Sequence, residues 1–174
     1  LDMLWETAHQ DELGVPPRPI TDQTVSMSRK EDHDRIVAHY MQPHIPYIRE
    51  ALSEDRSPTD VERGGWKCLE SGDADYDEVW SLYERNLRLV LDEVAVLLEN
   101  VDADNVVITA DHGNAFGEYS IYGHPEGMLL PSIKRVPWVE TSATDDGTFT
   151  PTGEYAGGGD GGTDGAGRDD ESET

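Results

Sequence analysis

The chain has 174 residues, and its 37 acidic and 13 basic side chains give a formal net charge of −24 at pH 7. This length suits a single domain of ordinary size. The negative charge disfavours binding to nucleic acid, whose phosphate backbone attracts basic surfaces. It is typical of salt-adapted proteins, because molar salt screens the repulsion between like charges. A mesophilic protein with an acidic tail is the alternative.

Cysteine content and hydropathy exclude two further classes of protein. Cys68 is the only cysteine, so an internal disulfide and a cysteine-rich zinc site are excluded, and we expect a partly buried structural thiol. The longest apolar stretch, Val94 to Leu98, is far shorter than the roughly 20 residues that span a membrane. No leader peptide is visible at Leu1. The compartment stays open, with the cytoplasm favoured.

The first part of the chain is expected to be a connecting region with little regular structure. Residues 1–34 are polar, and Pro16, Pro17 and Pro19 interrupt any long helix, although a short helix is expected around residues 2–10. The run Arg35 to Met41 is β-branched and aromatic, which predicts a strand covered on both faces. A stiff loop that contains His44 follows.

Residues 50–74 are polar, with a short helix expected after Pro58 and a turn at Gly64-Gly65. Asp75 and Glu78 then resemble a capping box, and the apolar spacing that follows predicts a helix over 76–100. Its apolar residues are Trp80, Tyr83, Leu87, Val90, Leu91, Val94, Leu97 and Leu98. A second buried strand is expected over 105–110. A helix between two buried strands predicts that the strands are parallel in one sheet.

Candidate site residues follow the predicted strand ends. Ligands of open α/β sheets bind beyond the carboxyl ends of strands, where His44 and the Asp111-His112-Gly113 segment fall. An Asp oxygen beside a His nitrogen can converge on one divalent cation, and Gly113 places no side chain in the way. In the alternative interpretation, Asp111 caps the next turn and His112 is merely buried.

The last part of the chain has no apolar periodicity. Residues 141–174 are therefore expected to form a disordered acidic tail rich in glycine and aspartate. A calcium-binding Gly-Asp repeat is disfavoured there, because the segment lacks the repeated apolar position that such repeats contain.

The order of the motifs resembles the sulfatase-like branch of the alkaline phosphatase superfamily. A helix from Tyr76 and a strand lead to Thr109-Ala110-Asp111-His112-Gly113, then to Gly117-Glu118, Gly123-His124 and Arg135-Val136-Pro137. Upstream, Pro43-His44-Ile45-Pro46 resembles the family's Pro-His-x-Pro segment. The resemblance makes residues 35–140 the carboxy-terminal part of an α/β domain. It implies an alkaline phosphatase-like sandwich, with a mostly parallel sheet flanked by helices and incomplete in this chain.

The resemblance also implies roles for individual residues. Asp111 and His112 would be ligands of one divalent cation, most simply Ca²⁺, Mg²⁺ or Mn²⁺. His44 would act as a cationic or proton-donating group near the ester oxygen, and His124 would contact the charged ester group. Glu118 is a candidate for orienting His112. The implied activity is hydrolysis of sulfate or phosphate esters, with a small anionic ester or a sulfated or phosphorylated glycan as substrate.

The family's nucleophile and its further Asp ligands have no counterpart in this sequence. No apolar strand ending in Asp-Asp or Asp-Ser precedes residue 35, and Cys68 has no Cys-x-Pro-x-Arg setting. We therefore expect little or no activity without an amino-terminal half, whether the chain is part of a longer hydrolase or the product of a split or degenerate gene. A noncatalytic glycan-binding or structural member is one alternative. A phosphosugar mutase is another, although its Asp-x-x-x-His ligand set is not found.

Overall fold

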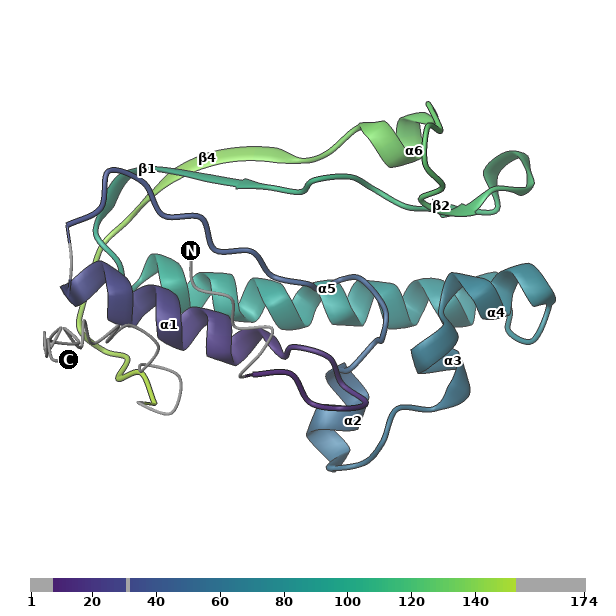
Figure 1. The fold of residues 1–174 in the computed structure, drawn as a ribbon, viewed down its shortest axis with the longest axis horizontal. Helices are drawn as coiled ribbons and strands as arrows, with labels where there is room; N and C mark the ends of the chain where they lie inside the picture. Colours follow the sequence, from purple (N-terminus) through teal and green to yellow (C-terminus); the bar gives the residue numbers. More distant parts are fainter. Residues whose placement is uncertain (1–7, 31, 153–174) are drawn as a thin grey trace, which may run out of the picture.

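The computed structural model describes residues 8–30 and 32–152. Its helices are α1 (Pro17–Lys30), α2 (Arg49–Glu54), α3 (Asp60–Gly64), α4 (Trp66–Ser71), α5 (Tyr76–Leu98) and α6 (Pro131–Lys134), with a 3-10 turn η1 (Glu118–Ser120). Its strands are β1 (Ala103–Thr109), β2 (Ala115–Phe116), β3 (Tyr122–Gly123) and β4 (Trp138–Ala143). In Figure 1 the long helix α5 runs along the molecule, and the β1–β4 ribbon lies on the side away from α2. None of the described helices is long and apolar enough to cross a bilayer.

The predicted parallel sheet of an alkaline phosphatase-like sandwich is wrong for this part of the chain. β1 pairs with β4 and β2 with β3, and both pairs are antiparallel. Residues 35–41, predicted as a buried strand, belong to neither sheet, and Val37 is 80% exposed. The described residues thus form a mixed helical protein with two small antiparallel sheets. An apolar, β-branched run favours extended backbone, but strand pairing and burial depend on neighbours that the run itself does not specify.

The predicted long helix is confirmed as α5. Asp75 caps it, because its carboxylate accepts a hydrogen bond from the backbone N–H of Glu78 at 2.8 Å. The buried face differs from the predicted one, since it consists of Val79, Leu82, Asn86, Val90 and Glu93. Trp80, placed in the predicted stripe, is 42% exposed. The observed face therefore takes a side-chain amide, that of Asn86, into the interior.

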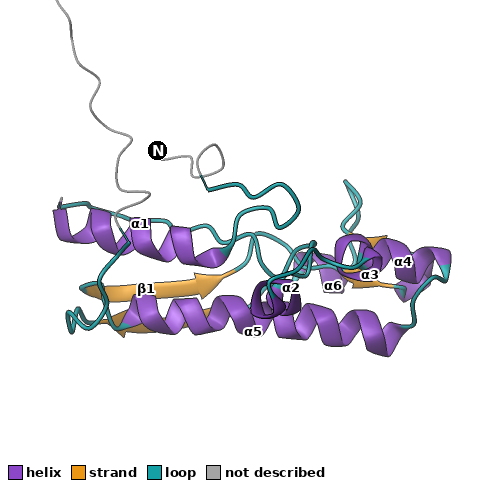
Figure 2. Ribbon diagram, turned by 90° about the horizontal axis from the view of Figure 1, so that it is seen from below, coloured by secondary structure: helices purple, strands orange, loops and turns teal. Residues whose placement is uncertain are grey.

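Helix α1 occupies part of the region that was expected only to connect. Pro17 and Pro19 lie in its first turn, where a missing N–H costs no hydrogen bond within the helix, so they begin the helix instead of interrupting it. α1 lies alongside α5 (Figure 2) and is joined to it by an ion pair of 2.8 Å between Arg18 and Glu93. Most of the short helix expected around residues 2–10 falls outside the described residues.

Part of the predicted tail is held against the helices. Strand β4 extends to Ala143, and the Arg29 guanidinium donates to both carboxylate oxygens of Asp145, at 2.6 and 2.7 Å. The side chain of Asn100 accepts a hydrogen bond from the backbone N–H of Phe149 at 2.8 Å. Polar contacts thus order residues up to 152 where apolar periodicity has already ended. Residues 153–174 of the predicted tail lie outside the described residues.

The main core lies beneath the candidate site residues. Tyr47, Val79, Leu82 and Phe116 form it, and Ile45 and Tyr83 pack against it. The β1–β4 ribbon, by contrast, exposes apolar side chains such as Val107 and Trp138. The strand predicted over 105–110 is therefore present as β1, but its predicted burial is wrong.

Candidate functional site

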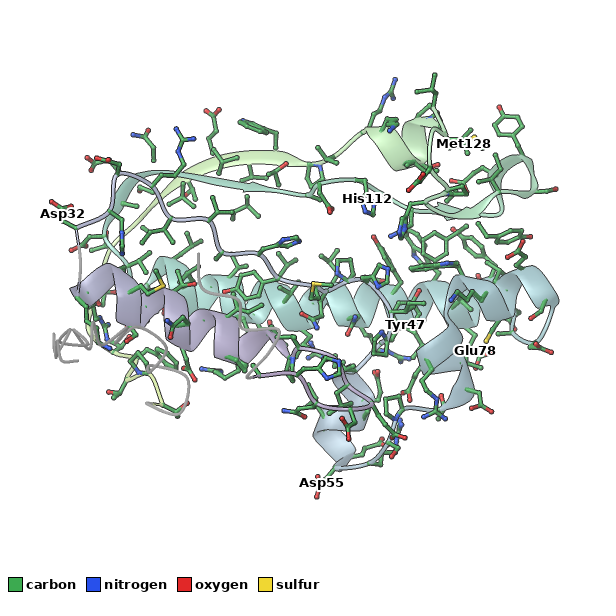
Figure 3. All side chains as sticks on the ribbon, in the orientation of Figure 1. Asp32, Tyr47, Asp55, Glu78, His112 and Met128 are labelled. Carbon is green, nitrogen blue, oxygen red and sulfur yellow. The ribbon has the colours of Figure 1, made fainter. Side chains whose placement is uncertain are left out.

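Three histidines lie together, and one of them, His44, is far from the other two in the sequence. His44 belongs to the loop before α2, His112 follows β1, and His124 follows β3. The ring centroids of His112 and His124 are 4.3 Å apart, and those of His44 and His124 are 5.5 Å apart. Figure 3 shows His112 between the strip that carries β1 and β2 and the helices. The structure thus brings together the three predicted histidines, with Asp111 next to one of them.

The indole of Trp66 packs against this histidine cluster. Its ring centroid lies 5.1 Å from that of His44 and 5.7 Å from that of His124, and both contacts are edge to face. Trp66 is 7% exposed. No motif in the sequence singled it out, because one tryptophan in a polar segment has no spacing that indicates a site.

Each imidazole has its Nδ1 beside an oxygen that can only accept a hydrogen bond. The pairs are His44 with the Ile45 carbonyl at 2.6 Å, His112 with the Gly113 carbonyl at 3.0 Å, and His124 with Oδ1 of Asn114 at 2.7 Å. The proton of each neutral ring is therefore assigned to Nδ1. All three Nε2 atoms then keep a lone pair, the state in which histidine binds metals or accepts protons.

Asp111 uses its two oxygens differently. Oδ1 accepts a hydrogen bond from the backbone N–H of His112 at 2.8 Å, which is the turn-capping role of the alternative interpretation. Oδ2 lies 3.6 Å from Nε2 of His112. This distance is too long for a hydrogen bond, but it fits two donors that each lie about 2.0 to 2.4 Å from a shared cation. Capping and metal binding are therefore compatible in this residue.

The donor set within the described residues is small. The side chain of Asp111 is 66% exposed, so its second oxygen is open to solvent. Among residues 8–30 and 32–152, no group of three or more His, Cys, Asp or Glu side chains is arranged to hold a metal ion. Asp111 and His112 thus fit a cation as a pair, and further donors would have to complete its coordination.

Gly113 allows α6 to approach the Asp111-His112 loop closely. Its backbone N–H donates to the carbonyl of Ile133 at 2.8 Å, and a Cβ at this position would overlap the carbonyl oxygen of Ser132. A side chain here would push α6 away from the loop. The motif glycine is thus explained by packing.

Burial chiefly lowers the pKa of His124, and repulsion from His112 and His44 lowers it further, while Asp111 acts in the opposite direction. Burial and these two neighbours thus favour the neutral form of the His124 ring. A neutral ring suits a hydrogen-bonding group or a ligand better than a permanent positive charge. The predicted contact with an ester anion requires that the anion itself stabilise the protonated ring.

Glu118 supports the β2–β3 turn. Its carboxylate accepts a hydrogen bond from the backbone N–H of Phe116 at 2.6 Å. The group beside Nδ1 of His112 is instead the Gly113 carbonyl. The orienting partner of His112 is therefore a backbone oxygen, which a search for acidic side chains does not find.

No known protein family, curated protein or solved structure matches the chain.

Proposed function

We propose that Asp111 and the histidine cluster form part of a metal-dependent site for sulfate or phosphate esters, of the kind found in sulfatase-like hydrolases. The convergence of His44, His112 and His124 beside Asp111 is the observation that supports it. The loop of His44 is far from the other two histidines in the sequence, and within the described residues it belongs to neither sheet. The Nε2 atoms of these histidines can bind a cation when unprotonated and can donate a proton or a hydrogen bond to an anionic ester when protonated.

Asp111 and His112 are the residues that would hold the cation, through Oδ2 and Nε2. A bound divalent cation polarises the ester oxygens and lowers the pKa of a nucleophile. A carboxylate with water as the other main donor suits Mg²⁺, Ca²⁺ or Mn²⁺. Water molecules, or groups outside the described residues, would supply the remaining donors.

His44 and His124 would act on the ester itself. Protonated Nε2 of His44 would donate its proton to the leaving alkoxide, and the negative charge of a bound ester favours this protonated form. His124, protonated when the anion is bound, would donate a hydrogen bond to the ester through its own Nε2. Because the sequence shows no counterpart of the family's nucleophile, we expect this chain to bind cation and anion with little or no turnover.

Retention of Mn²⁺ by the whole chain in molar KCl tests the proposal. Asp111→Asn keeps an oxygen for the His112 N–H but removes the charge, and Asp104→Asn is the matched control at an exposed position of β1. We expect Asp111→Asn to weaken Mn²⁺ binding by about tenfold or more, as loss of a ligand's charge should, and the control to bind as the wild type does.

Equilibrium dialysis with elemental analysis measures the affinity. Mn²⁺ should also broaden the NMR signals of His112 and His124 in the wild type and the control. Equal retention in all three proteins would overturn the ligand assignment. Mn²⁺-dependent hydrolysis of an aryl phosphate or aryl sulfate, lost in Asp111→Asn, would contradict the expected lack of turnover and show catalysis by the chain itself.

A further inference from the structure

Helix α5 directs two polar side chains at the loops that carry the site. Tyr83 and Asn86 are three residues apart, so they lie on one side of the helix. Asn86 is 0% exposed, and Tyr83 packs against the main core. Each side chain reaches a different histidine loop.

Asn86 fastens the loop of His44. Its Oδ1 accepts a hydrogen bond from the backbone N–H of Ile48 at 3.0 Å, and its Nδ2 donates to the carbonyls of His44 at 3.1 Å and Pro46 at 3.4 Å. A buried amide is costly unless its donors and acceptor are bonded. The oxygen and the nitrogen of this amide both form hydrogen bonds with one short loop, and these bonds fix the backbone of His44 to the helix.

Tyr83 reaches His124 through one intermediate amide. Burial raises the pKa of Tyr83, and the side chain of Asn114 beside its phenol acts in the opposite direction. The Oδ1 of Asn114 accepts from Nδ1 of His124 at 2.7 Å, so the NH₂ end of the amide is left for the phenol oxygen. Tyr83 is thus placed beside the amide that faces Nδ1 of His124.

We propose that Tyr83 and Asn86 are a pair of positioning residues that set the orientation and separation of His124 and His44. One rigid helix holds both loops, so the 5.5 Å between the two ring centroids needs no bond between the rings. The functional meaning of this pair rests on the proposed ester site, whereas the positioning itself can be measured without metal or substrate.

Two substitutions and a matched control separate positioning from general stability. Asn86→Asp keeps an acceptor for Ile48 but sets an oxygen against two carbonyls. Tyr83→Phe keeps the ring and removes only the phenol oxygen. Asn100→Asp is the control: Asn100 is also buried, its Oδ1 accepts from the N–H of Phe149, and its Nδ2 donates to the Val96 carbonyl at 2.9 Å, far from the cluster along α5.

Long-range ¹⁵N–¹H NMR of the imidazoles, in metal-free protein and molar KCl, is the measurement. We expect Asn86→Asp to shift the ring nitrogens of His44, and Tyr83→Phe to lower the fraction of His124 that carries its proton on Nδ1. Asn100→Asp should leave both rings as in the wild type. Unmoved rings in folded Asn86→Asp and Tyr83→Phe, or the same changes in Asn100→Asp, would overturn the proposal.

Wild-type hydrogen exchange decides the case if Asn86→Asp does not fold. The Ile48 amide and the Asn86 side-chain amide should exchange at least about tenfold more slowly than exposed amides of the same type. Rapid exchange of both amides would refute the proposal that Asn86 fixes the loop of His44. Loss of Mn²⁺ binding alone bears on the proposed function and not on the pair: a wild type that binds no Mn²⁺ but shows these NMR effects would refute only the metal site.

Discussion

Replacing Gly123 by alanine would test how tightly the histidine cluster is packed against Trp66. Gly123 is buried and has a φ of +69°, and a Cβ added to it would lie 2.6 Å from Nε1 of Trp66 and 3.1 Å from Cδ1. Unstrained contacts between such atoms lie near 3.5 Å or beyond. Either the indole or strand β3 must therefore move, and both adjoin His124.

Two unfavourable contributions to the free energy of folding add in Gly123→Ala. A left-handed backbone costs alanine about 1 to 2 kcal/mol, and overpacking a filled site costs about 1 to 3 kcal/mol. We expect Gly123→Ala to lower the free energy of unfolding by about 2 to 5 kcal/mol. Gly127→Ala is the matched control, because Gly127 has a φ of +75° but a Cβ there meets no atom within 4 Å. The difference between the two variants isolates the Trp66 contact.

Urea unfolding in molar KCl, followed by far-UV circular dichroism, measures the two free energies. NMR spectra of the folded variants report the rings, and the signals of His44 and His124 should move in Gly123→Ala only. Equal destabilisation by both substitutions, with unchanged NMR signals of His44 and His124, would show that the Trp66 side chain can move aside at little energetic cost. The indole would then have no part in fixing the cluster.

Acid should weaken the fold through Glu62, whose side chain is 4% exposed and accepts hydrogen bonds from Arg56 at 2.7 and 2.9 Å. These bonds chiefly hold the pKa of Glu62 below its ordinary value of 4.5, so its contribution is present above that pH and is lost as pH falls through the folded value. Urea unfolding of Glu62→Gln should accordingly show a weaker dependence on acid pH than the wild type, and identical dependences would contradict this assignment. Alkali acts through Tyr40, whose pKa burial raises to about 12 from 10.0. Stability should fall between those two pH values, and Tyr40→Phe, measured by the same method, should fall less. Because the net charge is −24, the urea midpoint should also rise with the concentration of KCl. The salt screens the repulsion, since the Debye length shrinks to about 3 Å at 1 M. A midpoint that does not change with KCl would refute salt adaptation.

The sequence predicted the elements whose signals are local and missed those that depend on pairing. Helix α5 begins at its predicted cap because Asp75 bonds within a single turn. Strand β1 was expected to be buried beside residues 35–41, but it pairs with β4, which extends into the segment expected to be a disordered tail. An apolar run indicates extended backbone equally well in a parallel sheet and in an exposed antiparallel ribbon, so its partner had to come from the structure.

In the candidate site, too, the sequence indicated the reactive side chains but not the residues that position them. His44, His112 and His124 could be singled out from short motifs, because those motifs contain the reactive groups themselves. Their supports could not, since Asn86 is an ordinary residue until the buried face of α5 is known.

Apolar side chains occur around much of α5, so periodicity alone favoured a face that contains Leu87 and Leu91. The face that includes Val79, Leu82 and Val90 also contains Asn86. A polar side chain on a buried face needs specific hydrogen-bond partners. For Asn86 those partners are the backbone groups of the His44 loop, so a residue that interrupts the apolar face of α5 also connects the core to the site.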